Sequence, residues 1–260
     1  MSRLVNIAVF ALSLVACGRV ANVTPTATEV GKSSKIVEGA SGRVWEQGKQ
    51  YDVIAGQQSV STGSGKVEVL EFFWYGCPHC YRLEPHLVLW NRQLRPEGVD
   101  FIRVPSTSRS SGSHAALARL FFSLKELGRE DLHDAVFDTI HRLGNPLYNA
   151  DEARTFQLQL EFAQSHGIAG EDFTRAYHSP SVDADLKSAA ELIKRYHIQE
   201  VPTLVVNGRY LTDLEHVGRN EYDLVEVVTA LVASERKGGE GTVRSASTAE
   251  KPTGPAIAAK

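Results

Sequence analysis

Cysteine is scarce in this sequence, with only three among 260 residues. Three cysteines cannot build the disulfide framework of a small secreted domain, so stability has to come from a hydrophobic core. Apolar residues make up 42% of the chain and charged residues 23%, which suits one or two domains with such a core. Long apolar runs are also lacking. The longest, Leu4–Ala16, holds roughly a dozen apolar residues, too few for a helix that spans a bilayer.

Clusters of basic residues are absent as well, so no nucleic acid is expected as a partner. The net charge is −3, but it is distributed unevenly. Residues 44–234 carry 18 Lys and Arg against 26 Asp and Glu, whereas segments 1–43 and 235–260 carry net charges of +3 and +2. The sequence therefore predicts an acidic folded body between two mildly basic arms.

The N-terminal segment has the pattern of an export signal. Arg3 precedes the apolar stretch Leu4–Ala16, which suits the h-region of a signal peptide. The letters LVAC at 14–17 resemble the lipobox of bacterial lipoproteins, which implies cleavage before Cys17 and attachment of a lipid to its thiol. The alternative is an ordinary secretory signal, cut in the same region, that leaves a soluble protein. Both interpretations place the chain outside the cytoplasm, where disulfides persist.

The other two cysteines lie at the junction of a predicted strand and a predicted helix. Val67–Tyr75 is a near-continuous apolar strand, typical of a sheet covered on both faces, and Cys77–Leu94 has helical periodicity. The tetrad at residues 77–80, CPHC, therefore stands where the helix begins. A gap of two residues brings the sulfurs within bonding distance and directs the first toward unpaired N–H groups and the positive end of the helix dipole.

Each residue of the tetrad has a predicted role. Cys77 is the candidate nucleophile, and Cys80, one turn inside the helix, is the candidate resolving thiol. Pro78 suits the first helical turn, where its missing N–H is no loss. His79 offers a hydrogen-bond donor or a positive charge to the Cys77 thiolate. Because these effects stabilise the reduced, ionised pair over the disulfide, the tetrad predicts an oxidant.

The rest of the chain alternates strands and helices. A strand at Val99–Val104 is expected to lie parallel to Val67–Tyr75, because a helix connects the two. From about Ser113 to Tyr196 the apolar period is helical. A hairpin around Asn207–Gly208 and a final helix at Glu221–Ser234 follow. This order predicts an α/β, thioredoxin-like fold with an inserted all-helical subdomain.

The predicted divisions of the chain follow from these elements. They are a signal peptide at 1–16, a flexible tether at 17–43, the first part of the thioredoxin-like domain at 44–112, a helical insertion at 113–198, the second part of the domain at 199–234 and a disordered tail at 235–260.

The chain resembles the DsbA family of periplasmic thiol:disulfide interchange proteins over about residues 45–234. The resemblance rests on LEFFWYGCPHCY at 70–81, VPTLVVNGRY at 201–210 and GKQY at 48–51. It implies that Cys77 forms a mixed disulfide with reduced or unfolded exported proteins and that Cys80 resolves it. It also implies that a quinone-linked membrane partner of the DsbB type reoxidises the pair, with no cofactor beyond the disulfide itself.

The resemblance assigns further residues. Val201 and Pro202 form a cis-proline loop that faces the tetrad and pairs with an extended substrate segment. Glu71 and Glu84 match acidic positions thought to tune the thiols or relay protons, and Arg103 stands near the buried lysine of the family. The lipobox and the polar tether depart from the soluble form of the family and suggest a periplasmic protein anchored through Cys17.

Other interpretations of the tetrad are weaker. Zinc needs about four ligands and no second cysteine pair exists, so no metal is predicted, and a structural disulfide across so small a loop adds little stability. A disulfide isomerase or reductase of the same fold is the first alternative. Isomerases of this fold carry a dimerisation domain, for which residues 18–43 are too few and too polar, so a monomer is expected. A non-catalytic binding or chaperone module is the second alternative, and the intact tetrad disfavours it.

Overall fold

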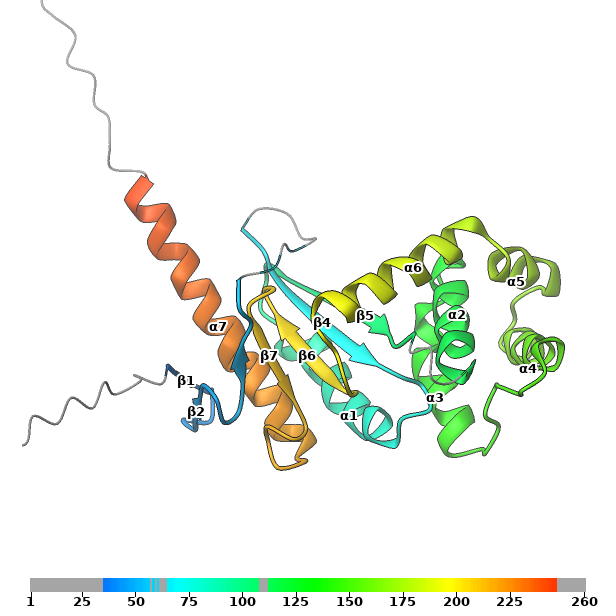
Figure 1. The fold of residues 1–260 in the computed structure, drawn as a ribbon, viewed down its shortest axis with the longest axis horizontal. Helices are drawn as coiled ribbons and strands as arrows, with labels where there is room; N and C mark the ends of the chain where they lie inside the picture. The colour runs from blue at the N-terminus through cyan, green and yellow to red at the C-terminus, as the bar shows by residue number, and fades with distance from the viewer. Residues whose placement is uncertain (1–34, 57, 59, 61–64, 108–111, 247–260) are drawn as a thin grey trace, which may run out of the picture. The chain divides into compact units, whose positions relative to one another are not determined.

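A five-stranded mixed sheet organises the fold, which is seen in a computed structural model that describes residues 35–56, 58, 60, 65–107 and 112–246 (Figure 1). Its order is β3-β7-β6-β4-β5. The central strand β4 pairs in parallel with β5 and antiparallel with β6, and β6 and β7 form a hairpin. The strands are β3 (Asp52–Val53), β4 (Val67–Phe73), β5 (Val99–Pro105), β6 (Thr203–Val206) and β7 (Tyr210–Asp213).

The turn of this hairpin has the predicted Asn–Gly geometry. Asn207 and Gly208 both have positive φ, of 52° and 62°, as a two-residue turn between twisted strands requires. Glycine is also needed at position 208 for space, because a Cβ there would lie 2.5 Å from the carbonyl oxygen of Gln58.

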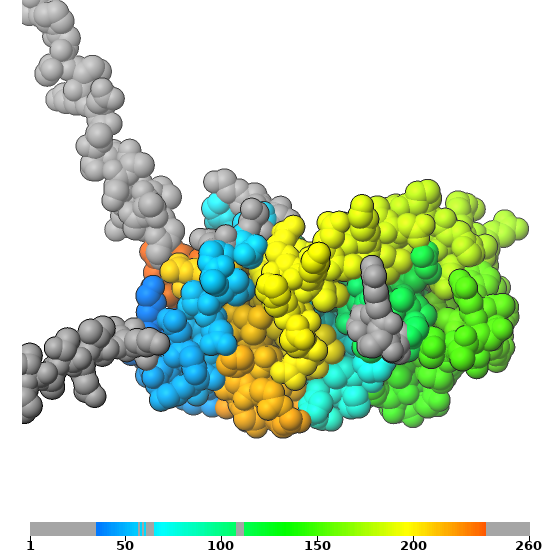
Figure 2. Space-filling model, in the orientation of Figure 1, coloured from blue at the N-terminus to red at the C-terminus, as the bar shows by residue number. Residues whose placement is uncertain are grey.

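Among the described residues, two α-helices flank the strands in sequence, and five more are inserted in the chain between two strands of the sheet. The first two are α1 (Pro78–Leu89), which continues as the π-helical segment η1 (Trp90–Leu94), and α7 (Glu221–Ala246). Between β5 and β6 lie α2 (Gly112–Glu126), the short 3₁₀ helix η2 (Glu130–Leu132), α3 (His133–His141), α4 (Glu152–Ser165), α5 (Gly170–Tyr177) and α6 (Pro180–Arg195). Helices α2 to α5 gather at one end of the molecule, coloured green in Figure 2, and α6 runs from that end toward the sheet (Figure 1). The α/β thioredoxin-like fold with a helical insertion is confirmed.

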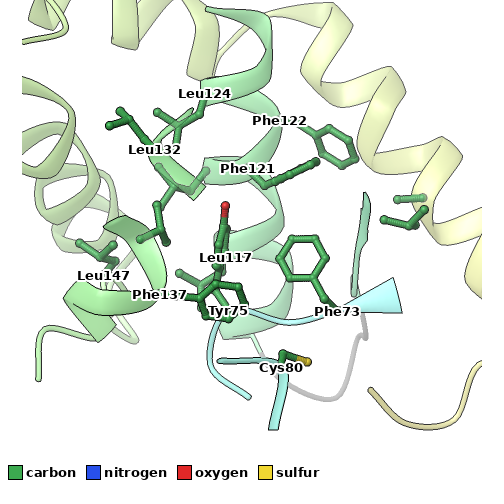
Figure 3. Packing of buried hydrophobic residues seen from close by; sticks show 14 of the residues in the cluster. Phe73, Tyr75, Cys80, Leu117, Phe121, Phe122, Leu124, Leu132, Phe137 and Leu147 are labelled. Carbon is green, nitrogen blue, oxygen red and sulfur yellow. The ribbon is translucent and has the colours of Figure 1, made fainter. Parts of the chain in front are cut away.

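Side chains that alternate along the strands point into two separate cores. Val69 belongs to a cluster with α1 and α7, whereas its neighbour Leu70 belongs to a cluster with the inserted helices. The second cluster is rich in aromatic rings and includes Phe73, Tyr75 and the Cys80 thiol (Figure 3). The tetrad therefore lies where the sheet meets the insertion.

The predicted flexible tether at 17–43 is wrong at its C-terminal end. Strands β1 (Ile36–Glu38) and β2 (Val44–Glu46) form an antiparallel hairpin there. Val37 and Trp45 are buried in the same cluster as α7, and Arg43 forms ion pairs with Asp223 and Glu226 of that helix. Apolar contacts and ion pairs thus order a segment whose composition looks like a linker.

Two further expectations need correction. The last helix does not end at Ser234 but continues to Ala246, so the first part of the predicted disordered tail is helical. Glu235 accounts for the start of this extension, because it accepts a hydrogen bond from Asn207 at 2.5 Å and pairs with Arg209 at 3.2 Å. Helix α5 lies within the segment 113–196 that was predicted to be helical, but it was not assigned as a separate helix, because its eight residues carry only a short apolar stripe.

The signal-like segment, the lipobox with Cys17 and residues 247–260 lie outside the described residues. In the part of the chain that the structure covers, no helix combines the length and apolarity needed to cross a bilayer.

Candidate active site

Cys77 occupies the N-cap of α1. Its Sγ accepts a hydrogen bond from the backbone N–H of Cys80 at 3.5 Å, and Pro78 follows as the first helical residue. Both thiols are free in the structure. Cys77 is 8% exposed and Cys80 is fully buried, so a substrate has access to the first sulfur only.

A loop from the far end of the chain meets this sulfur. The peptide bond between Val201 and Pro202 is cis, and the Cys77 thiol donates to the Val201 carbonyl oxygen at 3.4 Å. The hydroxyl of Thr203 donates to the Glu200 carbonyl and braces the loop from behind. A shallow hollow of about 80 Å³, lined in part by His79 and Pro202, lies beside it. The loop thus faces the tetrad, and its binding of substrate remains a prediction.

The two thiols differ in acidity. The pKa of Cys77 is lowered to about 6, first by the Cys80 thiol as a hydrogen-bond donor. The backbone N–H groups of Cys80 and His79 and the charge of Arg82 also lower it, while burial opposes them. Burial raises the pKa of Cys80 well above its ordinary value. At neutral pH Cys77 is therefore mainly a thiolate and Cys80 a thiol, which suits a nucleophile and a resolving thiol.

The His79 side chain turns toward two residues that were not predicted. Its Nδ1 accepts a hydrogen bond from Arg82 Nη2 at 2.6 Å and lies 3.8 Å from a carboxylate oxygen of Glu221. The same guanidinium donates through Nε to Glu221 at 3.0 Å. Arg82 stands two residues after Cys80 and was open to prediction as a nearby charge. Glu221 comes from α7, and no local pattern connects it to the tetrad.

A buried cluster of charges lies beneath the tetrad. Arg103, on β5 directly opposite Glu71 on β4, donates to Glu84 of α1 at 2.5 Å. Its Nε lies 3.2 Å from Glu71, without the alignment of a hydrogen bond. Burial is the main cause that raises the pKa of Glu71 to about 8 and that of Glu84 to about 7, although Arg103 opposes it. One guanidinium thus serves two carboxyls, and Glu71 keeps its proton at neutral pH.

The cluster continues to a histidine and a tyrosine that were not predicted as site residues. Burial lowers the pKa of His133 well below its ordinary value and raises that of Tyr75, so both are neutral. The Tyr75 hydroxyl and His133 Nδ1 form a hydrogen bond of 2.8 Å, and Nε2 is the other ring nitrogen. That nitrogen faces the second oxygen of Glu84 at 3.4 Å. His133 opens the apolar stripe of α3, and the stripe alone indicated only core packing.

The chain is similar to proteins of known family. A family profile described as Thioredoxin matches residues 60–219. The thiol:disulfide interchange protein DsbA of Burkholderia cepacia is 40% identical over 166 residues, which are 64% of this chain and 74% of that protein. DsbA of Azotobacter vinelandii is 39% identical over 190 residues, 73% of this chain and 84% of that protein. A crystal structure of Pseudomonas aeruginosa DsbA has 32% identity and a TM-score of 0.68, and covers 75% of this chain and 97% of that one.

Proposed function

Because the chain belongs to the DsbA family of thiol:disulfide interchange proteins, which are oxidoreductases of the thioredoxin fold, we propose that it is a dithiol oxidase that donates the Cys77–Cys80 disulfide to newly exported proteins. The observation that carries the proposal is the asymmetry of the two thiols. The sulfur that a substrate can reach belongs to the stabilised thiolate, and its partner is buried.

The reaction proceeds by two exchanges. A substrate thiolate attacks the Cys77 sulfur of the disulfide, the bond between the two sulfurs breaks, and Cys80 leaves and takes up a proton. A second substrate thiolate then attacks the substrate sulfur of the mixed disulfide, and Cys77 leaves as a thiolate. Two electrons pass from the substrate to the pair. The two substrate thiols release two protons, of which Cys80 keeps one.

The acidity of Cys77 supports the oxidising direction. A pKa lowered from 9.0 to about 6 stabilises the reduced pair at pH 7 by about 1.4 kcal/mol, or about 30 mV toward the oxidising side. Once the Cys77 sulfur is in a disulfide it carries no charge. The N-cap hydrogen bonds and the Arg82 charge then no longer stabilise it. The disulfide is therefore the less stabilised form and a better donor.

The export pattern at 1–16 and the lipobox support a periplasmic protein that is anchored to a membrane through Cys17. A quinone-linked membrane oxidase of the DsbB type is the proposed partner for reoxidation, and the redox-active disulfide is the proposed sole cofactor. The protein is proposed to act as a monomer, with Val201 and Pro202 binding extended substrate segments, and with Glu71 and Glu84 modulating the thiols.

The direct test is the reduction potential of the pair in glutathione buffers, measured with Cys17→Ser so that only two thiols report. We expect a value well above that of thioredoxin, about −270 mV. A value near that of thioredoxin would instead support the alternative, a reductase of the same fold.

The roles of the two cysteines are tested in the same assay. Cys77→Ala should abolish the oxidation of a dithiol peptide, whereas Cys80→Ala should accumulate a mixed disulfide with it. Activity that survives in Cys77→Ala would contradict the assignment and leave room for the non-catalytic alternative.

A further inference from the structure

We propose that Glu221 is a positioning residue for the reactive sulfur, because it holds the Arg82 guanidinium against His79 and so keeps a positive charge beside the Cys77 thiolate. The inference rests on the proposed function and deepens it, since it concerns how Cys77 is kept reactive. It also assigns a role to the first residue of α7, which no local motif indicates.

The geometry is a bridge between two helices. Arg82 lies on the second turn of α1 and Glu221 opens α7, and these helices pack against each other. Arg82 uses Nε toward Glu221 at 3.0 Å and Nη2 toward His79 at 2.6 Å. The Arg82 side chain is 52% exposed and the Glu221 side chain 18%. The less exposed carboxylate therefore holds the more exposed guanidinium.

Glu221 is itself well held. Burial opposes its ionisation, but its own backbone N–H, Arg82 and His79 outweigh burial and lower its pKa. The other acidic groups of the first turns, Asp223 and Glu226, face away toward Arg43 at 2.7 and 2.6 Å. The acidic start of α7 is thus divided, with Glu221 assigned to the tetrad and the other two to the β1–β2 hairpin.

Two consequences reach the thiol. The charge of Arg82 is one of the causes that lower the pKa of Cys77. A guanidinium can only donate, so His79 Nδ1 has to accept and the ring proton sits on Nε2. The other charged groups around His79 are Glu200, Glu215 and Arg219, of which the last two form an ion pair with each other. Arg82 is also paired, with Glu221, and its charge acts on the Cys77 sulfur from that position.

The test is the pH dependence of Cys77 alkylation by iodoacetamide in the full chain with Cys17→Ser. Arg82→Gln should raise the alkylation midpoint by about half a pH unit, the scale of one charge near a protein surface. Glu221→Gln should raise it as well, because the guanidinium is released. In the Arg82→Gln background Glu221→Gln should not raise the midpoint further, because no guanidinium is left to release.

The direction in which Glu221→Gln shifts the alkylation midpoint decides between two explanations. If Glu221 acted only through its own charge, its removal would favour the thiolate and lower the midpoint. A lowered or unchanged midpoint in Glu221→Gln, or full additivity with Arg82→Gln, would overturn the proposal. Arg43→Gln is the matched control, since it releases Asp223 and Glu226 on the same helix and should leave the midpoint unchanged.

A second readout separates positioning from folding. The ¹⁵N shifts of His79 should report a ring protonated at Nε2 in the wild type and a mixture of tautomers in Glu221→Gln. A ring that is unchanged in the variant would contradict the bridge. The wild-type reduction potential is measured independently, so a thioredoxin-like potential would overturn the oxidase proposal while leaving the Glu221 result to be judged on its own.

Discussion

At the scale of single residues, Cys77 and Cys80 are three positions apart and have opposite surroundings. The Cys77 sulfur accepts hydrogen bonds from backbone and side-chain donors at the start of α1. Cys80, in contrast, is part of the aromatic core below Phe73 and Tyr75 (Figure 3). Donors favour the charged form of a thiol and apolar burial disfavours it. The difference in reactivity therefore follows from one helical turn of displacement.

This difference predicts the pH dependence of the reduced protein. Alkylation of Cys77 should be half-maximal near pH 6, because its pKa is lowered to about that value. A lowered pKa means that the thiolate contributes stability, fully present above pH 9 and lost as the pH falls through 6. The thermal midpoint of the reduced protein should therefore fall more steeply between pH 8 and pH 5.5 than that of Cys77→Ala. An alkylation midpoint near pH 8.5 would contradict the prediction.

At the scale of elements, Arg103 connects β5 to its parallel neighbour β4 and to α1. It pairs with Glu71 of the strand and Glu84 of the helix, and all three side chains are largely buried. Removing the guanidinium leaves two buried carboxyls without their cation, and the ionised fraction of Glu84 then has no partner. The two carboxyls thus depend on one guanidinium.

Arg103→Met should therefore lower the free energy of unfolding by about 3–5 kcal/mol, the range for breaking a buried pair. Urea denaturation at pH 7 measures it. Arg175→Met is the control, because the exposed Arg175 pairs only with its helical neighbour Asp172, and its loss should cost about 0.5 kcal/mol or less. Equal losses in the two variants would show that the buried cluster does not bear on stability.

How much the sequence could predict depends on whether the signal is local. The strand Val67–Phe73, the helix after it and the Asn–Gly hairpin have local periodicity or turn chemistry, and the structure shows them. The hairpin β1–β2 was missed because each of its strands has only three residues and because contacts with α7, not a local pattern, hold it in place. Arg103 was suggested only by family resemblance.

The remaining site residues have no sequence signal of their own. His133 reaches Glu84 and Glu221 reaches Arg82 through contacts between elements that are far apart in the chain. A glutamate such as Glu221 is common on helix surfaces, and the apolar stripe that His133 opens indicated core packing, so neither pattern pointed to the site. Such residues are found only when the packing of the helices is known.

At the scale of the whole molecule, helices of the insertion lie at one end of a continuous sheet, and the N-terminal hairpin and α7 lie together at the other end (Figure 1).

The anchor itself is tested by fractionation of cells that produce the chain. We expect the wild type in the membrane fraction and Cys17→Ala in the soluble periplasmic fraction, because the lipid would be attached to that thiol. Detergent should release the wild type without high salt, because acyl chains rather than charge contacts would hold the protein in the membrane. Wild-type protein that is already soluble would leave the ordinary secretory signal as the interpretation.

The contact between Cys77 and Val201 has a consequence for the order of biogenesis. The sulfur and the carbonyl that it meets are separated by 124 positions in the chain, and the strand that carries the loop forward, β6, inserts directly beside β4. A chain that emerges from its N-terminus exposes both cysteines long before that loop exists. Until that loop has folded, the chain is a reduced polypeptide with both cysteines exposed, and the site is complete only when the last quarter of the sequence has folded onto the first half.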